Sequence, residues 1–257
     1  MKNRFRIFFI TIFSFLTLMH LSLADEFIFN STEIEISEDG NIITASEGTA
    51  VSTSDAIKIE AKKFTYNKSQ SILYANSGIV KSTEDNIEIR ANKLIFNQNL
   101  SIINATGNVK IEDLNKNFLF ESQNISYDIK KKIISSESKS SFKDNSNNFF
   151  LVKNFIYTIK NRLIKMYNAE VTTSTNDVYK IEEAYLNLNN QLLIGKDISI
   201  NFNSMSSDKG ISARLKGNTI SANNLESTIN KAVFTTCKKS DDCPPWQFSA
   251  KTIKHDK

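Results

Sequence analysis

Apolar residues recur along this chain in a pattern that repeats about every thirty residues. Within one copy they occupy relative positions 0, 2, 7, 9 and 15, and among six successive copies only Thr158 breaks the pattern. A fixed period of about 20 to 50 residues is the sequence signature of a repeat architecture. The copies comprise Phe27, Phe29, Ile34, Ile36, Ile42; Ile57, Ile59, Phe64, Tyr66, Ile72; Ile87, Ile89, Leu94, Phe96, Ile102; Phe118, Phe120, Ile125, Tyr127, Ile133; Phe149, Leu151, Ile156, Thr158, Ile164; and Tyr179, Ile181, Leu186, Leu188, Ile194.

The pairs at positions 0/2 and 7/9 alternate with period two and are rich in β-branched and aromatic residues. This alternation predicts strands with one buried face. The step from position 2 to position 7 is odd, so a straight strand would place the two pairs on opposite faces, and a bend or bulge must lie between them. We expect each copy to form a strand, a bend and two further strands, with the five positions stacked into five inward-facing rows.

These features predict an all-β fold, an open, groove-forming antiparallel β-jellyroll of stacked short strands over residues 25–210, followed by C-terminal strands in 211–257. The rows could form the closed core of a solenoid or line a groove for acyl chains, and periodicity alone does not choose between them. The predicted lining comprises Phe27, Phe29, Ile34, Ile36, Ile57, Ile59, Phe64, Tyr66, Ile87, Ile89, Leu94, Phe96, Phe118, Phe120, Ile125, Tyr127, Leu151, Ile156, Ile181, Leu186 and Leu188.

Residues 1–24 have the organisation of an export signal. Three basic residues precede an apolar run from Ile7 to Leu18, and Ser22-Leu23-Ala24 offers small residues where a signal peptidase reads. We expect cleavage before Asp25. The alternative, an uncut membrane anchor, is disfavoured because the run is short for a span of roughly 20 residues. The mature chain is therefore expected outside the cytoplasm, where cysteines can be oxidised.

Charge and composition exclude several function classes. The formal net charge of +4 includes three basic residues of the signal, so the mature chain is close to neutral and nucleic-acid binding by bulk charge is disfavoured. His20 and His255 are the only histidines, and His20 lies in the signal. The mature sequence places no nucleophile beside a base. We expect no catalysis, no metal and no cofactor.

The C-terminal residues carry a more specific signal. Phe234-Thr235-Thr236-Cys237 is followed by Trp246 and by an Ile253-Lys254-His255-Asp256 tail. This ordered set resembles the end of the periplasmic, OstA-like domain of LptD, the lipopolysaccharide-assembly outer-membrane protein family also known as organic solvent tolerance protein. The repeats upstream resemble the β-jellyroll that this family shares with the other periplasmic lipopolysaccharide-bridge proteins.

The resemblance implies lipopolysaccharide transport at the periplasmic face of the outer membrane, with acyl chains shielded in an open groove. It also implies a bridge protein paired with an edge strand, which we place in the first copy, Phe27 to Ile42. A barrel with its plug lipoprotein would lie beyond Lys257. The family pairs the Thr-Thr-Cys cysteine with a barrel cysteine, and here Cys243 is an additional candidate partner for Cys237. A freestanding bridge protein in the periplasm would share the same mechanism.

Three further points stay open on the sequence. A closed β-solenoid serving as an adhesin or scaffold is the alternative from another class, although the regular Gly and Asn turn ladders of such coils are absent. Trp246 fits a packed edge cap or a lipid contact at the groove mouth. The run Lys130-Lys131-Lys132 fits a solvated turn better than a docking site for lipid phosphates.

Overall fold

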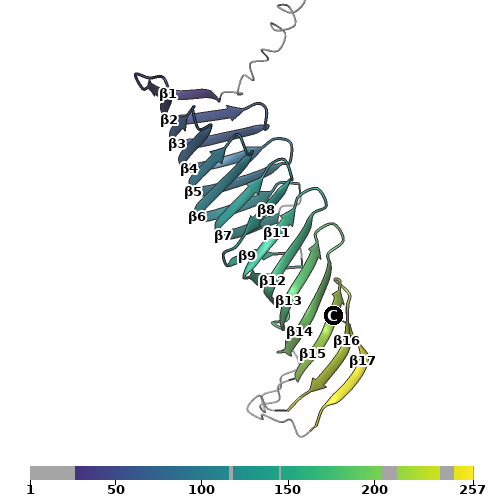
Figure 1. Cartoon of the computed structure of the whole chain (residues 1–257). Helices are drawn as coiled ribbons and strands as arrows, with labels where there is room; N and C mark the ends of the chain where they lie inside the picture. The colour runs from purple at the N-terminus through teal and green to yellow at the C-terminus, as the bar shows by residue number, and fades with distance from the viewer. Residues whose placement is uncertain (1–26, 116–117, 145, 204–212, 238–245, 257) are drawn as a thin grey trace, which may run out of the picture.

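The computed structural model of the chain describes residues 27–115, 118–144, 146–203, 213–237 and 246–256. Every regular element in these ranges is a β-strand, and seventeen strands form one antiparallel sheet that does not close into a barrel. Most strands pair with their neighbours in the chain, so they stack in sequence order from β1 to β17 along one long axis (Figure 1). The all-β, repeat-built prediction is confirmed. The signal predicted for residues 1–24 lies outside the described residues.

Each repeat supplies two long strands. In the second copy, β3 (Ile57–Asn67) spans template positions 0 to 10, and β4 (Ile72–Ser82) begins at position 15. The predicted strand, bend and strand are therefore one bent strand, and a copy is a hairpin. The other strands of the first half are β1 (Ile28–Ile36), β2 (Ile42–Ser52), β5 (Ile87–Asn97), β6 (Ile102–Asp113) and β7 (Phe118–Asp128).

The middle of the stack is built from short strands. β8 (Ile133–Ser136) and β9 (Ser140–Lys143) both pair with β7, and together they take the place of one long strand. Four serines lie at this break, and the hydroxyl of Ser122 is 2.9 Å from that of Ser136. These hydroxyls bond to one another and to nearby carbonyls, and such side-chain bonding competes with a regular strand. β10 (Phe149–Val152) and β11 (Asn154–Thr158) are likewise the two pieces of the next strand.

The regular pattern resumes in the second half, on both sides of residues 204–212, which contain the predicted boundary at residues 210 and 211 and lie outside the described residues. β14 pairs with β15 over nine residue pairs, so the C-terminal strands belong to the same sheet as the repeats. The strands of this half are β12 (Leu163–Thr172), β13 (Val178–Asn187), β14 (Leu192–Phe202), β15 (Ala213–Ala222), β16 (Glu226–Thr235) and β17 (Phe248–Asp256).

A bend near the centre of each long strand divides the sheet into two facing halves. Ile59 and Phe64 are five residues apart and both have 0% of their surface exposed, which confirms the bend that the odd step predicted. Residues with positive φ lie on the neighbouring strands at this level, for example Glu47 at 43° in β2 and Ser77 at 50° in β4. Such backbone changes re-aim the side chains that follow.

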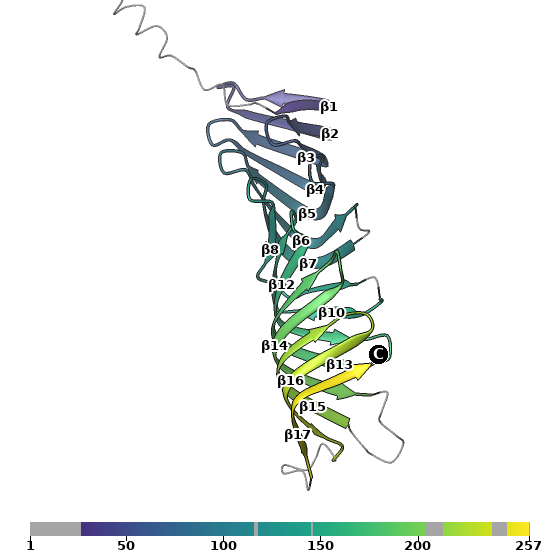
Figure 2. The same ribbon diagram turned by 90° about the vertical axis from the view of Figure 1, so that its right-hand side faces the viewer.

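The turns lie in two rows, one along each long side of the folded sheet. Turn row A contains residues 37–41, 68–71, 98–101, 129–132, 159–162, 188–191 and 223–225. Turn row B contains residues 53–56, 83–86, 114–115, 144, 146–148 and 173–177. We call the sheet halves beside them wall A and wall B, and the space between the two turn rows the mouth. Figure 2, turned by 90°, shows that the stack twists along its axis, as expected from the twist of β-strands.

The fifth predicted row is wrong by one residue in the first half and again at Ile194, which is 49% exposed while its neighbour Leu193 is buried. Leu73, Ile103 and Ile134 are buried on the inner face, whereas their predecessors Ile72 and Ile102 are only partly buried and lie on the outer face. In the first half the inner row starts one residue later because the second strand of each hairpin begins after a four-residue turn, and adjacent strand residues face opposite sides.

Candidate functional site: the interior and its mouth

The interior between the walls is lined by an unbroken apolar row on wall B. One residue from each successive level of the stack is joined to the next by the strand register, and every member is apolar. We call this set inner row B. It consists of Phe29, Ala50, Ile59, Val80, Ile89, Ile111, Phe120, Phe142, Phe150, Val171, Tyr179, Ile200, Leu215, Phe234 and Phe248.

Aromatic rings from the two walls meet across the interior. Phe120 of wall B stacks on Phe155 of wall A with ring centroids 5.0 Å apart, and Phe27 contacts Tyr66 of wall A at 5.1 Å. Near the C-terminal end Phe202 contacts His255 at 5.1 Å. Aromatic pairs at such distances stabilise the structure beyond their area burial. The two walls are therefore in direct contact through their inner side chains.

Most of the predicted lining residues are buried between the walls, although a lipid-binding role for them stays a prediction. Phe29 is partly buried, and the fully buried members are Phe27, Ile57, Ile59, Phe64, Tyr66, Ile87, Ile89, Leu94, Phe96, Phe118, Phe120, Ile125, Tyr127, Ile181, Leu186 and Leu188.

Two predicted lining residues are on the wrong face. Leu151 pairs with Ser141 and Glu170 on the outer face and is only partly buried, and Ile156 is 38% exposed. Their neighbours Phe150, Val152, Phe155 and Tyr157 are buried in their place. The break between β10 and β11 shifts the register here, and the template did not contain it.

Ile34 and Ile36 lie on the predicted face but are exposed. Their cross-strand partners are Ala45 and Ile43, whose side chains belong to the interior. Ile34 is nevertheless 46% and Ile36 62% exposed, because β1 is the terminal strand and no strand covers it on its other side among the described residues. The inner face is thus accessible at the N-terminal end of the stack.

Tyrosine hydroxyls connect wall A to acidic residues in and beside turn row B. The Tyr127 hydroxyl donates to Asp85 Oδ2 at 2.7 Å, and the Tyr157 hydroxyl donates to Asp113 Oδ2 at 2.6 Å. Burial raises the pKa of both phenols far above the ordinary value, and the neighbouring carboxylates raise it further. Both phenols therefore stay protonated and act as donors.

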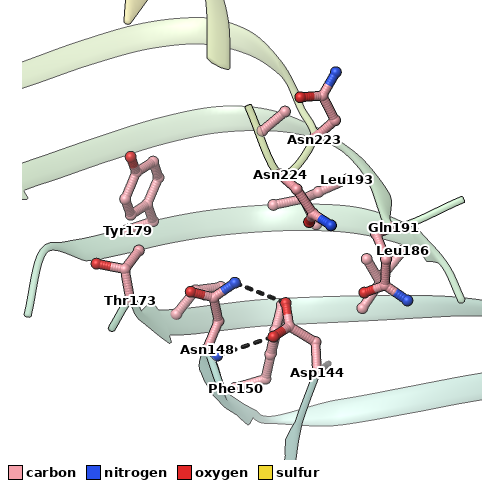
Figure 3. A pocket seen from close by; sticks show the side chains of 12 residues that line it. Asp144, Asn148, Phe150, Thr173, Tyr179, Leu186, Gln191, Leu193, Asn223 and Asn224 are labelled. Atoms are coloured by element: carbon pink, nitrogen blue, oxygen red, sulfur yellow. Dashed lines mark hydrogen bonds between the residues drawn. The ribbon is translucent and has the colours of Figure 1, made fainter. Parts of the chain in front are cut away.

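Toward the C-terminal half, a small polar-rimmed cavity of about 30 Å³ lies at the mouth (Figure 3). Its apolar lining includes Phe150, Tyr179 and Leu193 from the interior. Amide side chains, one threonine and one carboxylate form its rim, where Asn148 Nδ2 donates to Asp144 Oδ2 at 2.7 Å. The rim residues are Asp144, Asn148, Thr173, Gln191, Asn223 and Asn224. The Gln191 side-chain oxygen is buried without a hydrogen-bond partner.

The candidate cysteines do not form a disulfide in this structure. Cys237 is a buried free thiol, and Cys243 lies outside the described residues. The Cys237 thiol lies 3.6 Å from the Trp246 carbonyl oxygen, which also accepts a hydrogen bond from Thr235 at 2.9 Å. Trp246 is 48% exposed and contacts Phe234. Its ring therefore lies at the C-terminal end of inner row B.

Within the described ranges no three His, Cys, Asp or Glu residues are grouped so as to hold a metal ion. The same ranges contain no helix that is both long and apolar enough for a membrane span. Searches for a matching protein family and for a similar curated protein both found none.

Proposed function

We propose that this protein is a non-enzymatic conduit for lipopolysaccharide on its way to the outer membrane. In this proposal the acyl chains lie between walls A and B and the phosphorylated sugars lie outside the mouth. The observation that carries the proposal is inner row B, which is apolar at every level from Phe29 to Phe248. A sliding lipid needs contacts of similar kind at each level, so that no position traps it. The tail from Phe234 to Asp256, which resembles LptD, supports the same function.

The walls would have to part to admit an acyl chain. Each acyl chain would replace contacts between opposing side chains, such as that of Phe120 with Phe155, by apolar contacts between those side chains and the lipid. Such an exchange leaves the apolar area removed from water nearly unchanged, so its free-energy cost is small compared with exposing the same side chains to water. The open sheet permits this movement, since no strand pairing joins wall A to wall B at the mouth among the described strands.

The two ends of the stack fit the proposed partners. β1 pairs only with β2, and β17 only with β16, among the described strands, so each offers a free edge. Inner-face side chains are exposed there, Ile36 by 62% and Phe248 by 58%. A periplasmic bridge protein would add its edge strand to β1, and the barrel with its plug lipoprotein would lie beyond β17. A freestanding bridge protein would use both ends in the same way.

A closed scaffold or adhesin is the second candidate, and the close packing of the interior favours it. Ile59, Phe64, Phe96 and Phe120 have 0% of their surface exposed, as expected of a core that never opens. An adhesin or scaffold of this kind would bind its partner through the polar outer faces of the sheet.

Photo-crosslinking to lipopolysaccharide separates the two candidates. A photoreactive amino acid is placed at Ile125, which is 4% exposed on the inner face, or at the exposed Gln123 of the same strand. The conduit predicts adducts at Ile125 and none at Gln123. Adducts at neither position, in a chain with an unchanged β-sheet circular dichroism spectrum, would favour the scaffold and contradict the conduit.

A further inference from the structure

Opposite charges face each other across the mouth near the middle of the stack. The turn 129–132 of row A carries three lysines, and the turn 83–86 of row B carries Glu84 and Asp85. More than forty residues separate the two turns in the chain, but the bends of the intervening strands bring them together. Lys131 pairs with Asp128 of its own turn region at 2.9 Å, so it does not reach across.

Lys132 bridges the two turn rows directly. Its Nζ lies 2.6 Å from Glu84 Oε1 and 2.9 Å from Asp85 Oδ1. The other oxygen of Asp85 accepts the hydrogen bond from Tyr127, whose ring is buried in the interior. The Asp85 side chain is 7% exposed, so this carboxylate is held in a largely water-excluded position by one ammonium and one phenol. Glu84 and then Asp85 raise the pKa of Lys132, which keeps it charged.

Backbone hydrogen bonds do not reinforce this bridge. The turn-to-turn bonds in the described residues run along each row, such as Thr83 N to Ala56 O within row B and Ile159 N to Lys132 O within row A. Here the mouth is therefore bridged by side chains. Side-chain bridges can be exchanged without breaking the sheet, whereas the strand ladders cannot.

We propose that Lys132, Glu84, Asp85 and Tyr127 form a clasp that holds the mouth shut, and that release of this clasp opens the interior to an amphipathic ligand. Release leaves Asp85 without its cation, and a carboxylate in a water-excluded position is driven toward solvent. Movement of Asp85 also removes the nearer acceptor of Tyr127 and leaves only Ser82 Oγ at 3.4 Å, so the turn 83–86 and the end of β7 can separate. Only the identity of the ligand rests on the proposed function.

The clasp can be tested by measuring the width of the mouth. Spin labels are attached to cysteines at the exposed positions Thr83 and Lys130, in a chain that carries Cys237→Ser and Cys243→Ser, and their separation is measured by pulsed electron resonance. Lys132→Glu is expected to add a population with a longer distance. The exchange Lys132→Asp with Asp85→Lys restores the pair in reverse and should return the distance toward that of the parent chain. Lys131→Glu is the matched control, because its partner lies on the same side of the mouth.

A neutral apolar dye, N-phenyl-1-naphthylamine, provides the second readout. Lys132→Glu should increase its fluorescence several-fold over the parent, and the charge exchange should suppress that increase. Unchanged distance and unchanged dye binding in a folded Lys132→Glu chain would overturn the clasp. Opening without any lipopolysaccharide adduct at Ile125 would keep the clasp and reject the conduit. Adducts at Ile125 with an unchanged distance would reject the clasp alone.

Discussion

The hydroxyl of Tyr157 donates a 2.6 Å hydrogen bond to Asp113 Oδ2, joining the end of β11 on wall A to the end of β6 on wall B. Asp113 is 1% exposed, and its other oxygen accepts the backbone N–H of Asn115 at 3.0 Å. A carboxylate this deeply buried is stable only while its oxygens are hydrogen-bonded. This contact fixes the spacing of the two walls one turn further along the stack than the Tyr127 and Asp85 pair.

Replacing Tyr157 by phenylalanine should therefore lower the free energy of unfolding by about 1–3 kcal/mol, because Asp113 keeps its burial and loses a donor. Urea unfolding followed by circular dichroism measures the change. Adding Asp113→Asn should recover part of the loss, since a neutral amide is less costly to bury than a carboxylate. Tyr74→Phe is the control, because Tyr74 is 42% exposed, and it should change the free energy by less than about 0.5 kcal/mol. An equal loss in Tyr74→Phe would contradict the special role of Tyr157.

The register of the fifth copy is tested by two adjacent truncations. Phe155 is 1% and Ile156 38% exposed, and they point to opposite faces of β11. Phe155→Ala should cost about 3–5 kcal/mol, because it leaves a cavity between the walls, whereas Ile156→Ala should cost about 1 kcal/mol or less. A larger loss of unfolding free energy for Ile156→Ala than for Phe155→Ala in urea would support the register that the repeat template predicts and contradict the structure.

The same segment shows where sequence reasoning succeeds and where it fails. The alternation Ile57, Ile59, then Phe64, Tyr66 predicts both the inner face and the bend of β3, and the structure agrees. In the run Phe149 to Val152 every residue is apolar, so alternation gives no reason to choose a face. The break at Lys153 determines which of these residues face the interior. The pairing of β11 with β8 shows this break, whereas the thirty-residue template does not contain it.

The mouth could not be derived from periodicity, because its contacts join residues more than forty positions apart. Tyr127 fits the template as one more apolar residue, yet its hydroxyl has to find a partner once the ring is buried. That requirement is a usable signal, since Tyr66, Tyr127 and Tyr157 recur on the same wall. The identity of the partner, Asp85 or Asp113, depends on how far the sheet folds over, and no local pattern encodes that.

Gly48 sets how closely β1 can lie against β2. A Cβ built on Gly48 would collide with the carbonyl oxygen of Asn30 and approach the Cα of Ser31 to 2.7 Å, and both are backbone atoms that cannot rotate away. Gly48→Ala should therefore displace β1 and lower its stability by about 1–3 kcal/mol. Hydrogen exchange of the amides in Ile28–Ile36 should become faster, with little change in β5. Thr49→Ala is the control at the next residue, and comparable acceleration in that variant would contradict the steric explanation.

An ion-pair network on the outer face predicts a defined acid dependence. Glu183 lies between Lys196 at 2.8 Å and Lys165 at 2.9 Å, and the Tyr185 hydroxyl donates to it at 3.0 Å. Lys196, then Lys165 and Tyr185, lower the pKa of Glu183 to about 2. The folded pKa is thus below the unfolded value of about 4.3, so the stabilising contribution is complete above roughly pH 4.3 and is lost as the pH falls toward 2.

Glu183→Gln removes that contribution at every pH, so its urea midpoint should lie below that of the parent chain at pH 7 and approach it as the pH falls from 4.3 toward 2. The comparison cancels the acid sensitivity of all other carboxylates, because both chains share them. Glu121→Gln is the control, since Glu121 and its partner Lys110 are 53% and 54% exposed and such pairs contribute about 0–1 kcal/mol. A gap between parent and Glu183→Gln that stays constant from pH 7 to pH 2 would show that Glu183 acts through packing and not through its charge.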